Sequence, residues 1–421
     1  MDKLHQQQSF DPIVAPVTSA EIKGVLILSL GFGLVGIDRF LISTMYPAIA
    51  QELHLGYGDI GKITGALAFA WGIAALLMGN VADHIGQRRV LVASLVAFSL
   101  LIGLSGLATG LAGLIAVRLM MGFADGAFTP ASIAATIKLS PVQRHGRNVG
   151  FQQTMLVLFG LGLSPLLVGA LLTRGVEWRY IFSIFLLPGL LVAWLTRRWI
   201  ADRAPVDGAR LERPRRAAID DWLSVARYRN IRLLMPGMFC WLTCLITTSA
   251  FLPSYLLGHL KLDSGSMGGV MSAIGFGAMT GTIVLSALSD RIGRRPVMLI
   301  SSCGALVGLV LLGLIGPNAP ALFACLFAIH FFNNALITMT VGPIAAESVP
   351  PALMTTASGL IIATGELLGG GLAPMIGGQV AEHFGIEHIL RLPIAMMAVG
   401  IVLSLLLRET RGVAIERDHI H

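Results

Sequence analysis

Long apolar runs separated by short polar segments follow one another along almost the whole chain. A membrane-spanning helix needs roughly 20 apolar residues, whereas barrel strands alternate apolar and polar positions over shorter stretches. The runs are of the first kind, and they contain Gly and Pro, which membrane helices tolerate. The pattern predicts an all-α integral membrane protein with twelve transmembrane helices, at residues 23–50, 59–82, 90–108, 111–138, 147–173, 177–196, 230–258, 264–288, 296–315, 318–346, 354–381 and 385–407.

Two sequence patterns occur once in each half of the chain. Asp83-His84-Ile85-Gly86-Gln87-Arg88-Arg89 returns as Asp290-Arg291-Ile292-Gly293-Arg294-Arg295. Gly160-x-Gly162-x-x-Pro165-x-x-x-Gly169 returns as Gly369-x-Gly371-x-x-Pro374-x-x-x-Gly378. The duplication predicts two pseudo-symmetric six-helix bundles, and in a membrane protein it indicates an alternating-access carrier with its site at the seam between the bundles.

A polar segment rich in Arg and Pro separates the two halves. It predicts a cytoplasmic linker between the bundles, while the polar ends of the chain predict short tails. The expected divisions are an N-terminal tail at 1–22, an N-terminal bundle at 23–196, the linker at 197–228, a C-terminal bundle at 229–407 and a C-terminal tail at 408–421.

Composition agrees with a lipid environment. Hydrophobic residues make up 55% of the chain and charged residues 13%, and the mean hydropathy is +0.78. The net charge of +7 comes from Lys and Arg concentrated in alternate loops, which predicts that both termini are cytoplasmic. This distribution explains the basic excess through topology, so no nucleic-acid partner is expected. The polar start of the chain lacks the pattern of a cleavable signal peptide.

Asp38 and Arg39 lie in the middle of the first predicted span. An ionisable group at this depth costs at least ~2.5–3.5 kcal/mol, so it usually faces a cavity or a partner. Adjacent residues diverge by about 100° on a helix, so one side chain should face the cavity and the other a neighbouring helix. We expect Arg39 to bind a substrate carboxylate through its guanidinium. The alternative is a structural ion pair between helices.

Three further ionisable residues lie inside predicted spans. Asp125 follows Arg118 by two helical turns in the fourth span. A buried carboxyl of this kind is a candidate proton carrier, and so is Asp38. The alternative for Asp125 is a buried acid paired with Arg118 or Arg39. Arg118 is expected to pack helices together and to couple proton binding to substrate binding. Glu366 in the eleventh span is expected to be a second proton site or a contact for hydroxyl or ammonium groups of a substrate. The three acids Asp38, Asp125 and Glu366 outnumber the cations, so the entry of an anion should favour protonation of one acid.

Uncharged polar residues of the spans complete the expected site. Gln152 and Gln153 cannot both face lipid, so one is expected to bind substrate. Asn333 lies three residues after His330 in the tenth span, and both could line the cavity. A histidine hydrogen-bonded between helices is the alternative for His330.

The duplicated loop between the second and third spans, and between the eighth and ninth, predicts a cytoplasmic gate. Gly allows the chain to reverse, Arg holds the loop at the cytoplasmic face, and Asp can pair with Arg or cap a helix. We expect a charged latch that forms when this side closes. Its residues are Gly79, Asp83, Gly86, Arg88, Arg89, Asp290, Arg291, Gly293, Arg294 and Arg295.

This loop resembles the loop motif of the major facilitator superfamily of transporters. The matching residues are Gly79-x-x-x-Asp83-x-x-Gly86-x-Arg88-Arg89, with a second copy around Asp290. Arg408-Glu409-Thr410-Arg411-Gly412 is similar to a C-terminal element of that superfamily. His84 and Gln87 replace the basic residues usual in the family, so the first latch could be softer or pH-dependent. The resemblance spans the chain and implies the major facilitator fold.

Within the superfamily, the chain is most similar to the anion:cation symporter branch, which carries carboxylates with protons. The similar residues are Asp38-Arg39, Arg118-x-x-x-Gly122-x-x-Asp125-Gly126, Trp178-Arg179-Tyr180-Ile181-Phe182 and Pro188-Gly189. Asp125 replaces the Glu of that branch, and Glu366 stands where the branch often has Asn. Trp71 falls where the branch places a substrate-facing Tyr, which implies that Trp71 contacts substrate; the alternative is a Trp that packs between helices or faces lipid.

The expected function is proton-coupled uptake of a small organic anion: a carboxylate, a sugar acid or an aromatic acid. The alternative is a proton-coupled exporter of drugs or amphipathic metabolites, against which Arg39 argues. A membrane sensor or embedded enzyme is a third reading, but the sequence has no nucleophile elbow, phosphate loop or paired metal-ligand spacing. The expected partners are the substrate, protons and lipid; no cofactor or metal is expected. A monomer in a bacterial inner membrane is anticipated.

Overall fold

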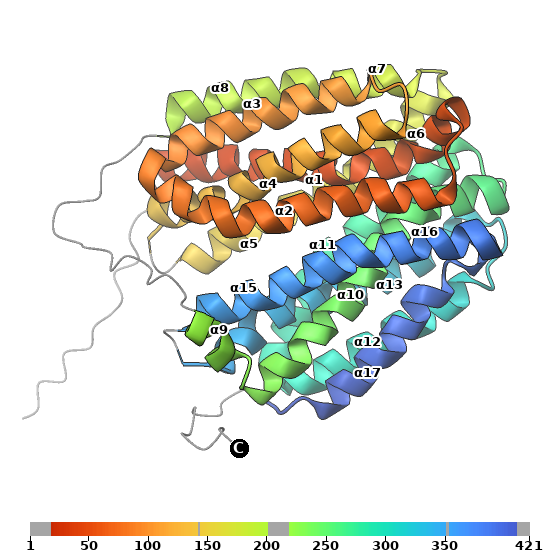
Figure 1. Ribbon diagram of the computed structural model, residues 1–421. Helices are drawn as coiled ribbons and strands as arrows, with labels where there is room; N and C mark the ends of the chain where they lie inside the picture. Colours follow the sequence, from red (N-terminus) through yellow and green to blue (C-terminus); the bar gives the residue numbers. More distant parts are fainter. Residues whose placement is uncertain (1–17, 142–143, 201–218, 351–352, 411–421) are drawn as a thin grey trace, which may run out of the picture.

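The computed structural model describes residues 18–141, 144–200, 219–350 and 353–410, apart from the side chains of 76–85 and 219–221. These residues fold into helices joined by short turns (Figure 1). The helices are α1 (Ser19–Leu53), α2 (Tyr57–Ile85), α3 (Gln87–Ser105), α4 (Leu111–Leu139), α5 (His145–Val157), η2 (Leu158–Leu163), α6 (Ser164–Thr173), α7 (Trp178–Ile184), α8 (Leu186–Trp199), α9 (Ile219–Val225), α10 (Arg229–Ser254), η3 (Tyr255–His259), α11 (Ser264–Ile292), α12 (Arg294–Leu312), α13 (Ala319–Met339), η4 (Thr340–Ile344), α14 (Ala345–Glu347), α15 (Met354–Thr364), η6 (Gly365–Leu372), α16 (Ala373–Phe384), η7 (Ile386–His388) and α17 (Arg391–Leu406).

Eleven helical segments of the described residues are long and apolar enough to cross a membrane, which confirms the predicted fold class. They coincide with eleven of the twelve predicted runs. The remaining run, 59–82, falls on α2, a helix of 29 residues whose side chains are described only as far as residue 75. The exact count of twelve spans therefore stays a prediction.

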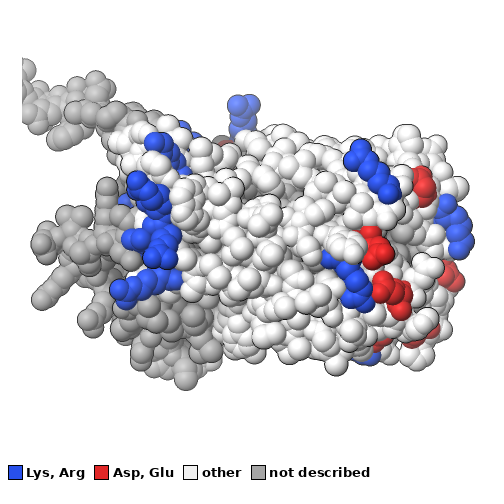
Figure 2. All heavy atoms as spheres, turned by 90° about the horizontal axis from the view of Figure 1, so that it is seen from above, with Lys and Arg blue, Asp and Glu red and all other residues white. Residues whose placement is uncertain are grey.

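Charged side chains gather at the two ends of the molecule. Figure 2 shows a broad, largely uncharged band between them, as expected for the lipid-facing surface. The basic end, as we call it, carries exposed Lys23, Arg89, Lys138, Arg147 and Arg198. The opposite end carries both signs of charge, with Glu52, Lys62, Arg174 and Glu177.

The helices form two bundles, one from α1–α8 and one from α10–α17 (Figure 1). In the first bundle α2 packs on α4, and α3 on α8; in the second α11 packs on α13, and α12 on α17. The predicted division into tails, bundles and linker stays a prediction. However, α8 continues to Trp199 and α9 lies within 219–225, so both enter the stretch expected to be linker. Residues 201–218 of that linker, residues 1–17 of the N-terminal tail and the C-terminal tail after 410 lie outside the described residues.

Glycines bring the two bundles into backbone contact in the half of the molecule away from the basic end. A Cβ added at Gly378 of α16 would lie 3.0 Å from Gly58 Cα of α2. A Cβ added at Gly268 of α11 would lie 2.8 Å from Gly169 Cα of α6. Small residues allow such close approach of membrane helices. The repeated glycine pattern of the sequence thus supplies, through Gly169 and Gly378, the surfaces along which the bundles meet.

Two π-helical segments occupy equivalent places in the two bundles. Segment η2 precedes Pro165, and η6 precedes Pro374. A π-helical turn widens the helix locally and is frequent at functional sites. Segment η6 carries Glu366, so the widened turn sits where an acidic side chain meets the seam.

Candidate functional site

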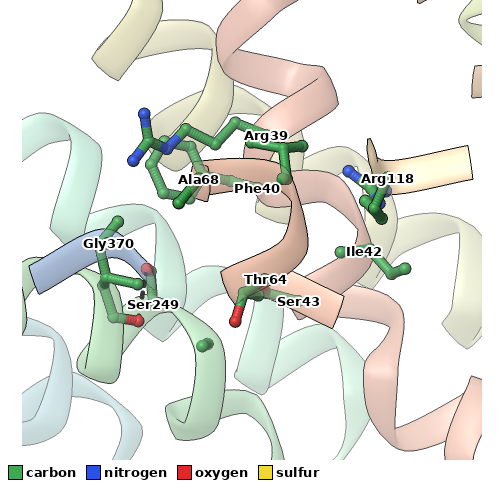
Figure 3. A pocket seen from close by; sticks show the side chains of 12 residues that line it. Arg39, Phe40, Ile42, Ser43, Thr64, Ala68, Arg118, Ser249 and Gly370 are labelled. Atoms are coloured by element: carbon green, nitrogen blue, oxygen red, sulfur yellow. Dashed lines mark hydrogen bonds between the residues drawn. The ribbon is translucent and has the colours of Figure 1, made fainter. Parts of the chain in front are cut away.

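A small cavity lies at the seam, near the middle of the molecule (Figure 3). The N-terminal bundle contributes side chains from α1, α2 and α4, and the C-terminal bundle contributes residues from α10 and η6. Its volume is about 20 Å³, enough for one water molecule but not for an organic substrate. The polar side chains that line it are Arg39, Ser43, Thr64, Arg118 and Ser249.

Arg39 binds a carboxylate of the other bundle through two hydrogen bonds. Its Nη2 donates to Oε2 of Glu366 at 2.6 Å, and its Nη1 donates to Oε1 at 3.2 Å. The Arg39 and Glu366 side chains are only 9% and 14% exposed. The guanidinium carbon also lies 4.6 Å from the ring centroid of Trp71, within the range of a cation–π contact. Arg39 therefore combines a two-point carboxylate contact with an aromatic face.

Asp38 points away from this pair, into the N-terminal bundle, as helix geometry requires of a neighbouring residue. It forms a buried group with Arg118 and Asp125 of α4, and all three side chains are at most 1% exposed. Arg118 Nη1 donates to the backbone carbonyl of Asp38 at 2.6 Å, and its charge faces both carboxyls.

The carboxyls of Asp38 and Asp125 interact electrostatically with each other as well as with Arg118. Neither receives a hydrogen bond from a donor group of the described residues. Since two ionised carboxylates are both acceptors, a bond between them forms only when one of them carries a proton. The group thus contains one cation, two acids and a place for one proton.

Two of the polar residues expected to bind substrate are used inside the bundles. Gln152 is fully buried, donates to Ser132 Oγ at 2.6 Å and accepts from Thr136 Oγ1 at 3.2 Å. Asn333 is also fully buried and donates to the backbone carbonyl of Trp241 at 3.2 Å. In this structure each amide holds two helices of one bundle together, and a contact of either residue with substrate stays a prediction.

Gln153 and His330 have different surroundings. Gln153 is exposed on α5 and does not line the cavity at the seam. His330 is fully buried, with its Nε2 3.1 Å from Thr248 Oγ1 of α10. Its position matches the interhelical histidine weighed as an alternative.

The two copies of the repeated loop have the same backbone turn. Gly86 has φ 100° and Gly293 has φ 106°, values that favour glycine, and each comes directly before a helix. Arg88 and Arg89 lie in the first turn of α3, whereas Arg291 lies in the last turn of α11. The side chains of Gly79 and Asp83 lie outside the described residues, so the first latch stays a prediction.

The second loop is tied to its own bundle. Arg294 binds Asp290 at 2.6 Å and Glu347 of α14 at 2.8 Å. Glu409, after α17, accepts from the backbone N–H groups of Arg294 at 2.8 Å and Arg295 at 3.0 Å. These contacts join three parts of the C-terminal bundle, and a gating role for them stays a prediction.

The sequence analysis did not identify Glu347 as a partner of Arg294, or Glu382 as a partner of the Gly58 backbone. Glu382 of α16 accepts from the Gly58 backbone N–H at 2.9 Å, across the seam at the end opposite the basic end. An acidic residue at the end of an apolar span was the available signal for both. It was too general to assign a partner.

Comparisons with known proteins agree with this architecture. The family model of the Major Facilitator Superfamily matches residues 28–367 and 258–418. Among solved structures, a D-xylose–proton symporter superposes with a TM-score of 0.75, at 18% identity, over 94% of this chain and all of that chain. The nucleoside transporter NupG superposes with a TM-score of 0.74, at 15% identity, over 92% of this chain and 98% of that chain.

Curated relatives match over nearly their whole lengths. A probable 4-methylmuconolactone transporter of Cupriavidus pinatubonensis is 27% identical over 92% of this chain and 90% of its own. A 3-(3-hydroxy-phenyl)propionate transporter of Escherichia coli is 26% identical over 82% of this chain and 83% of its own. A D-galactonate transporter of E. coli is 22% identical over 88% and 91%. These names are consistent with the anion:cation symporter branch. With its helices packed in two bundles and a family match over most of its length, the chain belongs to the major facilitator superfamily of membrane transporters.

Proposed function

We propose that this transporter carries a small organic anion together with a proton, by alternating access, and that Arg39 binds the carboxylate of the substrate. The observation that carries the proposal is the two-point contact of Arg39 with a carboxylate at the seam. Guanidinium and carboxylate match in this geometry, and the pairing is strong when partly buried. As a member of a transporter family, the protein is not an enzyme.

The relatives support the substrate class. The names of three of them specify 4-methylmuconolactone, an aromatic propionate and a sugar acid. The Trp71 ring beside Arg39 suits a substrate with a flat or apolar part next to its carboxylate. A cationic drug would meet the positive charge of Arg39, which disfavours the exporter alternative.

The buried group of Asp38, Arg118 and Asp125 is proposed to carry the proton. With both carboxyls ionised, the group holds one net negative charge at 0–1% exposure, which is costly in a medium of low dielectric. One proton makes the group neutral and lets the two carboxyls share a hydrogen bond. An anion arriving at Arg39 adds negative charge nearby and strengthens proton binding, and this coupling is reciprocal.

Topology follows from the charge distribution. The basic end, with Lys23, Arg89, Lys138, Arg147 and Arg198, is proposed to face the cytoplasm of a bacterial cell, so that both termini are inside. The contacts of Gly58 with Gly378 and of Gly169 with Gly268 then close the outer side. We further propose inward transport by a monomer in the inner membrane.

An uptake assay tests the proposal. The purified protein in liposomes is offered labelled 3-(3-hydroxyphenyl)propionate, D-galactonate and benzoate, with the exterior more acidic than the interior. At least one acid should accumulate, a protonophore should abolish the accumulation, and Arg39→Gln should abolish it too. The control Arg391→Gln removes an exposed charge at the start of α17 and should leave uptake unchanged. Uptake that persists in Arg39→Gln would remove Arg39 from the site.

A further inference from the structure

We infer that Glu366 is a tethered competitor for the substrate: its carboxylate occupies Arg39 in the empty carrier, and an incoming organic anion takes its place. This inference rests on the proposed function, because it requires Arg39 to bind the carboxylate of the substrate. It adds a role for a residue of the other bundle and a second step at which a proton is bound.

The Glu366 carboxylate contacts Arg39 in the way expected of the carboxylate of a bound substrate. Both Glu366 oxygens accept from Arg39, at 2.6 and 3.2 Å, as a free carboxylate would. The partners come from different bundles, α1 and η6, so the contact crosses the seam. Gly370, one turn after Glu366, leaves space for it: a Cβ there would lie 2.8 Å from Glu366 Oε2.

The cavity beside the Arg39–Glu366 pair is too small to hold a substrate carboxylate while Glu366 stays bound to Arg39. Its volume of about 20 Å³ holds one water molecule. An organic acid that contacts Arg39 must therefore displace Glu366 and part η6 from α1. Binding then changes an interaction between the bundles, which is what an alternating-access cycle requires of its substrate.

The displaced Glu366 carboxylate is left in poor surroundings. Arg39 is the one charged group that contacts it among the described residues. The described residues of α2 and α10 that lie nearest the glycines of η6 are uncharged, among them Ala68, Phe69, Met238, Leu242 and Thr243. The remaining titratable groups of this region, Asp38, Asp125 and Arg118, lie behind Arg39 in the N-terminal bundle.

Charge balance then predicts that the displaced Glu366 binds a proton. Before binding, Arg39 and Glu366 form a neutral pair. After the exchange, the anion neutralises Arg39, and the Glu366 carboxylate takes one proton from the surrounding solution, because a carboxylate that has lost its cation and lies among uncharged side chains is costly. No covalent bond other than this O–H bond forms or breaks. Each bound monocarboxylate thus brings one proton to the C-terminal bundle.

The variant Glu366→Gln tests the exchange, because its neutral amide is a weaker competitor and cannot take up a proton. For whichever of 3-(3-hydroxyphenyl)propionate, D-galactonate and benzoate the wild type takes up, the KM should fall by about tenfold, as removal of a competing bound state predicts. Proton uptake on mixing with that acid, followed by a pH indicator in weakly buffered detergent solution, should fall by about one proton per acid bound. The control Glu387→Gln makes the same change in a side chain that is 47% exposed, near His388, and both quantities should be unchanged.

A second variant guards against a folding defect. Glu366→Asp keeps a titratable carboxyl on a shorter arm, so it should lower KM by a smaller factor while proton uptake stays as in the wild type. If KM and proton uptake in Glu366→Gln equal those of the wild type, the inference is overturned while the proposed function stands. If the wild type takes up none of the three acids, the proposed function fails, and the inference fails with it.

Discussion

Arg118 donates a 2.6 Å hydrogen bond to the backbone carbonyl of Asp38, a residue 80 positions earlier in the chain. The bond joins α4 to the middle of α1. The same guanidinium supplies the positive charge that faces the carboxyls of Asp38 and Asp125. One side chain thus joins two helices and supplies a positive charge that faces two buried acids.

Replacement of Arg118 should destabilise the protein. Arg118→Met leaves two buried carboxyls without a cation and should lower the free energy of unfolding by about 3–5 kcal/mol. Arg118→Lys keeps the charge but loses the planar fork, so its loss should be smaller. Thermal unfolding in detergent measures both. Arg391→Met is the matched control at an exposed site, and a Tm loss in this control as large as in Arg118→Met would contradict the assignment.

Asp125→Asn should separate proton coupling from transport. The amide cannot bind and release a proton, so accumulation driven by a proton gradient should fall, whereas exchange of labelled for unlabelled acid across the membrane should continue. Liposome uptake with and without a pH gradient measures the two activities. Asp59→Asn, at a partly exposed side chain paired with Lys62 at 2.8 Å, is the control and should retain both. Undiminished accumulation in Asp125→Asn would exclude Asp125 from the coupling.

Neighbouring glycines of α11 offer a matched test of closure at the end opposite the basic end. A Cβ at Gly268 would meet the backbone of Gly169, whereas one at Gly269 would meet no atom within 4 Å. Gly268→Leu should therefore disfavour the closed interface by about 1–3 kcal/mol, the usual cost of overpacking, and Gly269→Leu should not.

Spin labels at positions 62 and 383 report this closure, because both side chains are exposed at that end, on α2 and α16. In a background without the native cysteines, the distance between the labels should lengthen in Gly268→Leu and stay unchanged in Gly269→Leu. Equal distance distributions in the two variants would show that this glycine contact does not control closure.

Glu409 should stabilise the C-terminal bundle without affecting substrate binding. Its carboxylate accepts from the first two backbone N–H groups of α12, which carry the positive end of the helix dipole. Glu409→Gln should cost about 1 kcal/mol, as loss of a helix cap does, and should lower Tm while KM stays constant. Glu387→Gln serves as the control. A changed KM at an unchanged Tm would be the contrary result.

Much of the architecture could be predicted from the sequence. The run predicted at 111–138 is observed as Leu111–Leu139, and the run at 264–288 as Ser264–Ile292. This accuracy has a physical cause: in lipid the backbone must satisfy its own hydrogen bonds, so an apolar run of sufficient length has little alternative to a helix. The divergence of Asp38 and Arg39 followed likewise from the angle between successive residues on one helix.

The partners of polar side chains depended on the tertiary structure. Periodicity places Arg39 at a depth and an angle on α1, but Glu366, in the other bundle, becomes its partner only because glycine contacts such as Gly268 with Gly169 bring the bundles together. Gln152 and Asn333 have suitable depths for the cavity, yet their amides hold helices within one bundle. A single helix fixes the direction of each side chain relative to its own axis. Which helix lies in that direction is set by the packing of all the others, and the free energy of pairing buried polar groups then selects the partner.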